Sequence, residues 1–259
     1  MLTLPFGMAI TPVHKTDTSP KPVFVLGVYA SAVHARWIDG DGRTIINALA
    51  VASEPEIFWR GDGAEELIER IPVPPGAGRL VPAGVNLNGP SGLTLDSMFL
   101  EPLGITRRDA WLCDLLPESR CNPSQRAAIN REYDTRRETL DLSAYDFPAV
   151  PRILASPVRR LEIQGEILAA SPEVLLTLGD QPLKWFARHY GAHATLGQYG
   201  ETSGTYGRLH DLEIEGQSLK LLPLVHPRQA GQLGSHSAKW TQLHAHWVTD
   251  VAPQLLTTF

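Results

Sequence analysis

His226 is the residue whose place in the sequence points most strongly to chemistry, because it directly follows a long apolar run and precedes Pro227. The run, 219–225, has the composition of a buried strand, and ligands of open α/β sheets bind outside the carboxyl ends of such strands. A neutral imidazole there can donate a hydrogen bond to a negative charge that develops during a reaction. A histidine that only caps the strand is the alternative. The strand-end position and Pro227 favour a pocket.

Other candidate groups follow two earlier apolar runs. Tyr29, Ser31 and His34 come after the first run, and Asp114 ends the second. A phenol with a pKa near 10 is a poor base at neutral pH, and Ser31 and His34 are other polar side chains of this segment. An ionised Asp114 offers hydrogen-bond acceptors only. It could read a ligand that presents donors, act as a catalytic carboxylate, or be a helix cap or a solvated loop acid.

The elements that must position these residues follow from the pattern of apolar side chains. Four continuous apolar runs are typical of buried parallel strands, and they cover 23–26, 110–113, 174–178 and 219–225. Apolar spacing and helix-start signals, such as Asp180 as an N-cap, predict helices over 91–103, 157–170, 182–190 and 238–256. Alternating strands and helices predict an α/β fold, a three-layer α/β/α sandwich with a central, mostly parallel sheet.

Three segments depart from this rhythm. Alternation around a turn of Asp and Gly residues predicts a β-hairpin over 33–52. The segment 72–89 is rich in Pro and Gly and is expected to form a long loop, and 1–22 is expected to be an extended lead-in that docks against the domain. We predict one domain over 1–259.

Composition limits the function classes. A net charge of −5 argues against a strongly basic nucleic-acid binder, although a local basic patch remains compatible with it. Cys113 and Cys121 are the two cysteines, too few for a disulfide framework or a four-cysteine cluster. No run is long and apolar enough for a membrane helix. We therefore expect a cytoplasmic monomer without cofactor or metal.

Three stretches in order resemble motifs of the uracil-DNA glycosylase superfamily, with a pattern most like its iron–sulfur branch. They are Asn88-Gly89-Pro90-Ser91-Gly92 with the run 103–112, then Pro172 to Gly179, then Leu222-Pro223-Leu224-Val225-His226-Pro227. The resemblance covers about residue 23 to the C-terminal helix, with an insertion near 30–85. The cluster cysteines of that branch are missing, so we expect no iron–sulfur cluster.

The resemblance implies a monofunctional DNA glycosylase, which flips a damaged or deaminated base, uracil or a related one, into a pocket during DNA repair. His226 would stabilise the departing base. Tyr29 stands where several branches place a water-activating Asp or Asn, so Ser31 or His34 could substitute. Asp114 replaces a base-reading Asn.

The resemblance also implies base-binding and DNA-binding positions. The stacking aromatic of the family aligns near Leu87, with Phe58 or Trp59 as alternatives, and Asn86 and Asn88 flank it. The implied base-binding residues are Gly27, Val28, Leu87 and Asn88. The implied DNA-binding residues are Ser91, Pro227, Arg228, Gln232 and Leu233, of which Gln232 or Leu233 would fill the space left by a flipped base.

Two alternatives stay open. The chain could be an inactive homologue that binds nucleic acid or a base-containing small molecule in the same pocket, which the altered Tyr29 and Asp114 positions favour. It could also be an enzyme that acts on nucleosides or nucleotides rather than on DNA.

Overall fold

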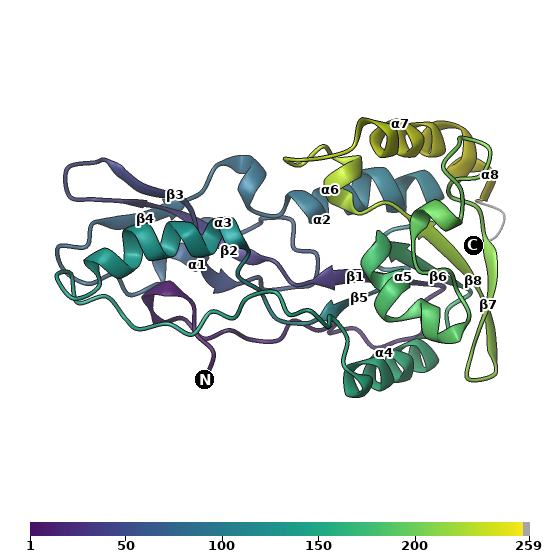
Figure 1. The fold of residues 1–259 in the computed structure, drawn as a ribbon, viewed down its shortest axis with the longest axis horizontal. Helices are drawn as coiled ribbons and strands as arrows, with labels where there is room; N and C mark the ends of the chain where they lie inside the picture. Colours follow the sequence, from purple (N-terminus) through teal and green to yellow (C-terminus); the bar gives the residue numbers. More distant parts are fainter. Residues whose placement is uncertain (256–259) are drawn as a thin grey trace. The chain divides into compact units, whose positions relative to one another are not determined.

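A mostly parallel five-stranded sheet organises the larger part of this computed structural model, which describes residues 1–255. Its strands, in spatial order, are β5 (Ala110–Leu116), β1 (Val23–Tyr29), β6 (Val174–Leu178), β8 (Gln217–Leu224) and β7 (His210–Ile214). The first four run parallel, and β7 is antiparallel to β8. All four strands predicted from apolar runs are confirmed (Figure 1).

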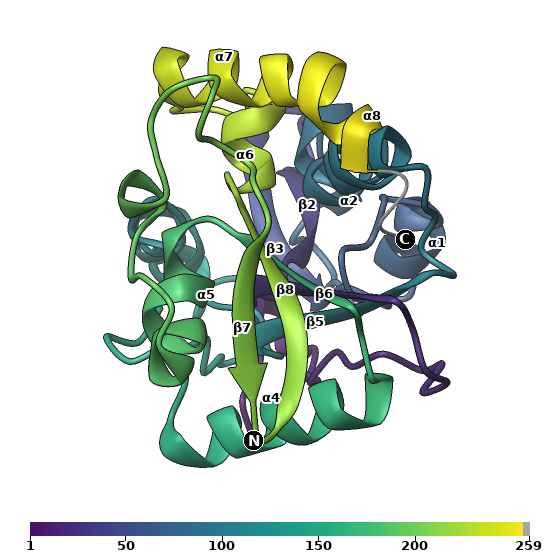
Figure 2. The same cartoon turned by 90° about the vertical axis from the view of Figure 1, so that its right-hand side faces the viewer.

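Helices lie on both sides of this sheet. Figure 2 shows α4 on one side and α7 on the opposite side, with the strands between them. The helices are α2 (Pro90–Leu95) with its continuation to Leu103, α4 (Pro157–Ala170), α5 (Asp180–Trp185) with a turn over Ala187–Tyr190, a turn at Leu196–Gln198, α6 (Pro227–Ala230), and α7 (Ala238–His246), which continues through Trp247–Val251 into α8 (Ala252–Leu255). The α/β class with a mostly parallel sheet is therefore confirmed.

The predicted helix over 157–170 matches α4 from end to end. The Ser156 side chain caps it by accepting from the Arg159 N–H at 3.1 Å, and Pro157 fits the first turn, where no N–H partner is needed. Ile163 and Ile167 are fully buried on its inner face. Asp180, expected as an N-cap, is instead the first residue of α5.

Pro223 lies inside β8, a position where a proline usually removes a ladder bond. The backbone N–H groups of successive residues in β8 point alternately toward β6 and toward β7. The pairing of β8 with β7 extends only to Leu221. Pro223 therefore has no strand that would need its N–H. Val225, on the same side, donates its N–H to the Tyr206 hydroxyl at 3.0 Å.

The chain divides into two compact units. Unit 1 comprises Met1–Val13, Ala30–Pro90 and Glu118–Arg152, and unit 2 comprises His14–Tyr29, Ser91–Pro117 and Ile153–Phe259, of which 256–259 lie outside the described residues. The sheet β5-β1-β6-β8-β7 belongs to unit 2. The prediction of one domain over 1–259 stays a prediction, because compact units of one chain can share a domain.

Unit 1 contains an antiparallel sheet in the order β3-β2-β4. The strands are β2 (Ala32–Ile38), β3 (Thr44–Ser53) and β4 (Arg79–Pro82). The β2–β3 pair confirms the predicted hairpin, whereas the segment expected as a long loop contributes β4. Its helices are α1 (Ala64–Glu69) and α3 (Pro123–Ala128), which continues through Ile129–Tyr133 and Asp134–Arg136, with short turns at Pro5–Gly7 and Val85–Leu87.

The N-terminal segment is built into the core of unit 1. The Phe6 ring meets Trp37 and Tyr133 edge-on, with centroid distances of 5.5 and 5.3 Å. The Tyr133 hydroxyl accepts from the Phe6 N–H at 2.8 Å and donates to the Ser143 carbonyl at 2.9 Å. The expected lead-in thus supplies core residues to unit 1, and the remainder of 1–22 enters unit 2. Among residues 1–255, no helix is both long and apolar enough to span a bilayer.

Candidate functional site

His226 sits just past β8, at the N-cap of α6, with Pro227 as the first residue of that helix. Its Nδ1 accepts a hydrogen bond from the Arg228 N–H at 3.1 Å. Burial lowers the pKa of His226 to about 4, and the charge of Arg228 acts in the same direction. The ring is therefore neutral at physiological pH. Because a backbone N–H can only donate, Nδ1 carries no proton, and the proton of the neutral ring sits on Nε2.

A buried network holds the end of β8 in place. Since the Tyr206 hydroxyl accepts from Val225, it donates its own proton to His244 Nδ1 at 2.8 Å. His244 Nε2 then donates to the Met98 carbonyl at 3.0 Å. His244 is fully buried, and its burial lowers its pKa to about 4, in keeping with this neutral form. The network fixes the backbone directly before His226.

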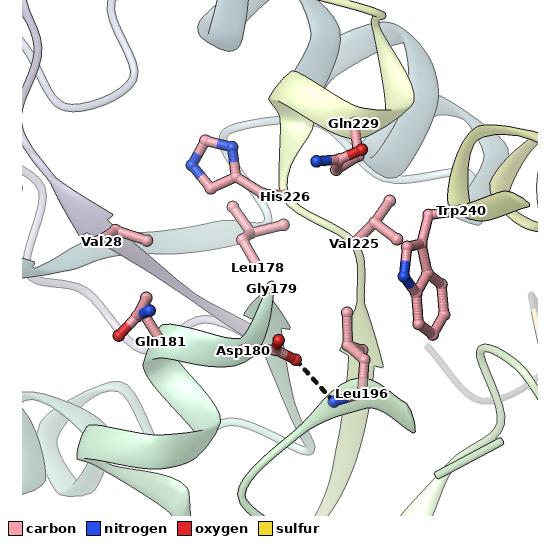
Figure 3. Close-up of a pocket in the computed structure, with 10 residues that line it drawn as sticks. All are labelled: Val28, Leu178, Gly179, Asp180, Gln181, Leu196, Val225, His226, Gln229 and Trp240. Atoms are coloured by element: carbon pink, nitrogen blue, oxygen red, sulfur yellow. Dashed lines mark hydrogen bonds between the residues drawn. The ribbon is translucent and has the colours of Figure 1, made fainter. Parts of the chain in front are cut away.

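Beside His226 lies a cavity of about 290 Å³ within unit 2 (Figure 3). This volume is close to the lower end of the range for small-ligand sites, roughly 300 Å³. The cavity is lined by Val28, Leu178, Gly179, Asp180, Gln181, Leu196, Val225, His226, Gln229 and Trp240. It therefore lies at the carboxyl ends of parallel strands, as predicted for the site.

Gly179 lets the chain pass close to His226. Its φ of +85° favours glycine, and a Cβ added there would lie 3.3 Å from the His226 Cβ. Its N–H donates to the Leu224 carbonyl at 2.7 Å, so β6 and β8 stay paired up to the pocket. A side chain at this position would crowd the backbone and the Cβ of His226.

Three polar side chains of the pocket are held by bonds to their neighbours. One carboxylate oxygen of Asp180 accepts from the Leu196 N–H at 2.8 Å. The side-chain oxygens of the two glutamines are held likewise: Gln181 accepts from the Trp185 indole N–H at 3.0 Å, and Gln229 accepts from the Ser237 N–H at 2.6 Å. Sequence reasoning missed all of these residues as pocket residues, and Trp240 with them.

Asp114 lies within β5, which continues to Leu116, rather than at the end of its strand. It pairs in register with Gly27 of β1 and is 3% exposed. Its Oδ1 has no hydrogen-bond partner among the described residues. Burial raises the pKa of Asp114 to about 7, although the nearby Arg159 charge works against this rise. Asp114 does not line the cavity beside His226.

Tyr29 is the last residue of β1. Burial raises the pKa of the Tyr29 hydroxyl. The positive charge of Arg228 lowers this pKa, and the negative charge of Asp114 raises it. Tyr29, Asp114 and Arg228 are therefore electrostatic neighbours. Val28 lines the cavity, whereas Gly27 lies one residue deeper in β1.

The other predicted catalytic residues, Ser31 and His34, belong to unit 1 and have structural bonds there. The Ser31 N–H donates to Glu54 Oε1 at 2.9 Å, and its carbonyl accepts from the Ser119 hydroxyl. His34 Nε2 lies 2.8 Å from the Gln125 amide nitrogen. Burial lowers the pKa of His34 to about 4.

Leu87 and Asn88, which were expected to bind the base, also lie in unit 1. The Asn88 side chain bonds both backbone groups of His34, accepting from its N–H at 2.7 Å and donating to its carbonyl at 2.9 Å. Asn88 thus acts like a short piece of neighbouring strand. Leu87 is exposed, and Trp59 is buried in the unit 1 core with its indole N–H bonded to the Asp62 carbonyl.

The expected DNA-binding residues form a closed turn after His226. Arg228 Nε donates to the Leu233 carbonyl at 2.9 Å, and the Leu233 N–H donates to the Arg228 carbonyl at 2.9 Å. Gln232 adopts a left-handed conformation, with a φ of +54°, and is exposed at the turn. Pro227 is buried. Ser91 is the second residue of α2 rather than its cap.

No protein-family model matches the chain, and no curated protein sequence is significantly similar to it.

Proposed function

We propose that this protein hydrolyses the N-glycosidic bond of a deaminated or damaged base in DNA, with His226 as the donor that stabilises the departing base. The observation that carries the proposal is the fixed tautomer of His226: Nδ1 accepts from Arg228, so the ring presents Nε2–H as a donor. A neutral donor beside a partly enclosed cavity is suited to a charge that develops only as the bond breaks.

In the proposed reaction, the bond between the sugar C1′ and the base nitrogen breaks, and its electron pair leaves with the base. A water molecule supplies the hydroxyl that bonds to C1′, and its remaining proton goes to the base or to solvent. His226 keeps its proton and donates a hydrogen bond throughout. Its pKa of about 4 keeps it neutral, so it does not protonate the base at neutral pH.

We assign the stabilisation of the sugar cation to Asp114. A carboxyl group with a pKa of about 7 is partly ionised near neutral pH. Because Asp114 is 3% exposed and does not line the cavity, it acts through its charge rather than by contact with the water. Tyr29 stays protonated there, because burial raises its pKa from an already high value. It can therefore donate a hydrogen bond but cannot accept the water proton.

Incubation with end-labelled oligonucleotides that contain one uracil or one hypoxanthine tests this function, since an abasic product breaks on heating in alkali. We expect strand breakage at the deaminated base only. Folded protein that leaves both bases in place, in single and in double strands, would refute the proposal.

A second candidate function is binding or hydrolysis of a free nucleoside. The residues that line the cavity include one acid and no Lys or Arg, which favours a ligand without phosphates inside the pocket. Release of base from inosine or deoxyuridine, with no release from the oligonucleotides, would favour this candidate.

A further inference from the structure

We propose that Asp180 and Gln229 determine specificity, by presenting one fixed acceptor and one fixed donor to the edge of the bound base. Together they select a base with a lactam edge, an N–H next to a C=O. This inference rests on the proposed function only in taking the ligand to be a nucleobase. It places base reading at the ends of β6 and β8, rather than at Asp114 on β5.

The Gln229 amide has only one possible orientation. The Ser237 N–H that meets it at 2.6 Å can only donate, so the amide atom that faces Ser237 must be the oxygen. The NH₂ group must then face the other way, and Figure 3 shows this nitrogen turned toward His226. The Thr241 hydroxyl also donates to the Gln229 carbonyl at 2.9 Å, which ties α6 to α7 behind the side chain. Gln229 therefore offers the pocket a donor.

Asp180 offers an acceptor. One of its oxygens accepts from the Leu196 N–H at 2.8 Å, which fixes the plane of the carboxylate. Figure 3 shows the other oxygen turned toward the middle of the pocket. An ionised carboxylate can only accept, so a ligand atom that faces this oxygen must carry a hydrogen.

The rest of the pocket is compatible with a flat, partly polar ring. Val28, Leu178 and Val225 supply apolar surface, and the indole nitrogen of Trp240 lies on the side that faces the cavity. Gln181 is oriented in the same way as Gln229, because the Trp185 indole N–H can only donate to its oxygen. The fixed side-chain groups therefore include several donors and one anionic acceptor.

This arrangement discriminates by hydrogen-bond polarity. Hypoxanthine presents N1–H and O6, which match Asp180 and Gln229. Adenine presents an acceptor at N1 and an amino group at position 6, so the donor of Gln229 would meet a donor and the carboxylate of Asp180 would meet a lone pair. The reversed edge is disfavoured, because it sets a donor against the donor of the half-buried Gln229 and leaves the exposed Asp180 oxygen without a partner on the base.

The test measures binding of free hypoxanthine and free adenine by NMR titration, so that it does not depend on bond cleavage. Gln229→Glu keeps the oxygen that faces Ser237 and turns the donor into an acceptor. Asp180→Asn adds a donor with little change of shape. We expect each variant to lower the preference for hypoxanthine by about tenfold. Gln229→Met removes the donor without adding charge, so it should weaken the binding of hypoxanthine but not the binding of adenine.

Two matched variants serve as controls. Gln164→Glu changes a glutamine of α4 whose oxygen accepts from the Tyr190 hydroxyl, and Asp109→Asn changes an exposed turn acid bonded to Thr106. Neither residue lines the cavity, and both variants should keep the preference of the parent protein. Far-UV circular dichroism checks that each variant is folded.

The outcomes separate this inference from the proposed function. A preference for hypoxanthine that Gln229→Glu and Asp180→Asn abolish supports the inference, even if no oligonucleotide is cleaved, in which case only the glycosylase proposal fails. A preference that both folded variants retain overturns the inference, even if cleavage occurs. Equal binding of both bases by the parent protein also overturns it. Failure of both bases to bind overturns the inference together with the base pocket.

Discussion

The two units each contain a half-buried histidine that was predicted to act in catalysis, and the surroundings of the two rings differ. His34 in unit 1 and His226 in unit 2 both have pKa values lowered to about 4 by burial. His34 is braced on both backbone groups by Asn88, and its Nε2 meets Gln125. His226 is held through Nδ1 alone, beside a cavity. Burial and a neutral ring therefore do not distinguish the two histidines, whereas the cavity beside His226 does.

The strongest test of unit 1 as a structural unit is Phe6→Ala. The substitution removes a ring that is 1% exposed and packs against Trp37 and Tyr133. We expect a loss of about 3–5 kcal/mol in the free energy of unfolding. Urea unfolding followed by tryptophan fluorescence measures it. A loss below about 1 kcal/mol would show that the N-terminal segment is not part of the core.

The matching test of unit 2 is His226→Ala. Removal of one donor to a developing charge lowers the rate of the chemical step by about 10²–10³-fold. The measurement is single-turnover excision from the uracil oligonucleotide. His226→Gln, which retains a donor, should recover part of the rate. An unchanged rate in a folded His226→Ala protein would show that His226 takes no part in the reaction and, like His34, has a structural role.

Tyr206→Phe tests whether the network behind His226 is structural. The variant leaves the Val225 N–H and His244 Nδ1 without their partner in a buried place. We expect a loss of about 2 kcal/mol in the free energy of unfolding. Because this bond positions the backbone directly before His226, the excision rate should also fall. A variant as stable as the parent protein would show that water replaces the hydroxyl.

The smallest expected effect is the gain in stability from Asp114→Asn. The folded pKa of Asp114, about 7, lies above the ordinary value of 3.8, so ionisation costs stability as pH rises from about 4, and the full cost is present above pH 7. The variant should therefore melt at a higher temperature than the parent protein at pH 8, and not at pH 4. The gain stays small because an asparagine is still a buried polar group. An equal shift at both pH values would contradict the pKa.

Acid has the opposite effect on the buried histidines. The folded pKa values of His34, His226 and His244, each about 4, lie below the ordinary value of 6.5. Their contribution to stability is complete above pH 6.5 and is lost as pH falls toward 4, because the unfolded chain binds the protons more tightly. Asp114 and the histidines therefore change the free energy of unfolding in opposite directions as pH rises. Single substitutions are needed to separate the two contributions.

The fold was predictable where burial made the sequence uniform. The four parallel strands are covered on both faces, so each contains a mostly apolar run. The edge strand β7 was missed because His210–Ile214 is short and contains two exposed acids in place of a continuous apolar run. β4 was missed because it lies in a segment rich in Pro and Gly, which otherwise indicates a loop.

The site was predictable only where a residue is tied to a strand end. His226 follows β8 in sequence, so its place was evident, and Val28 follows from β1 in the same way. Gln229 and Trp240 reach the cavity from α6 and α7 through tertiary packing, and no local pattern indicates this. Ser31 and His34 were expected beside Tyr29, but the chain leaves unit 2 after Tyr29 and enters unit 1.

The interleaving of the two units also sets an order for folding on the ribosome. The last segment of unit 1 ends at Arg152, so this unit has all of its residues while the C-terminal part of the chain is still being translated. β1, in contrast, is translated early, and its neighbour β6 begins only at Val174. Pairing so distant in sequence is slow. We therefore expect β1 to keep one edge unpaired in the nascent chain until β6 has been translated.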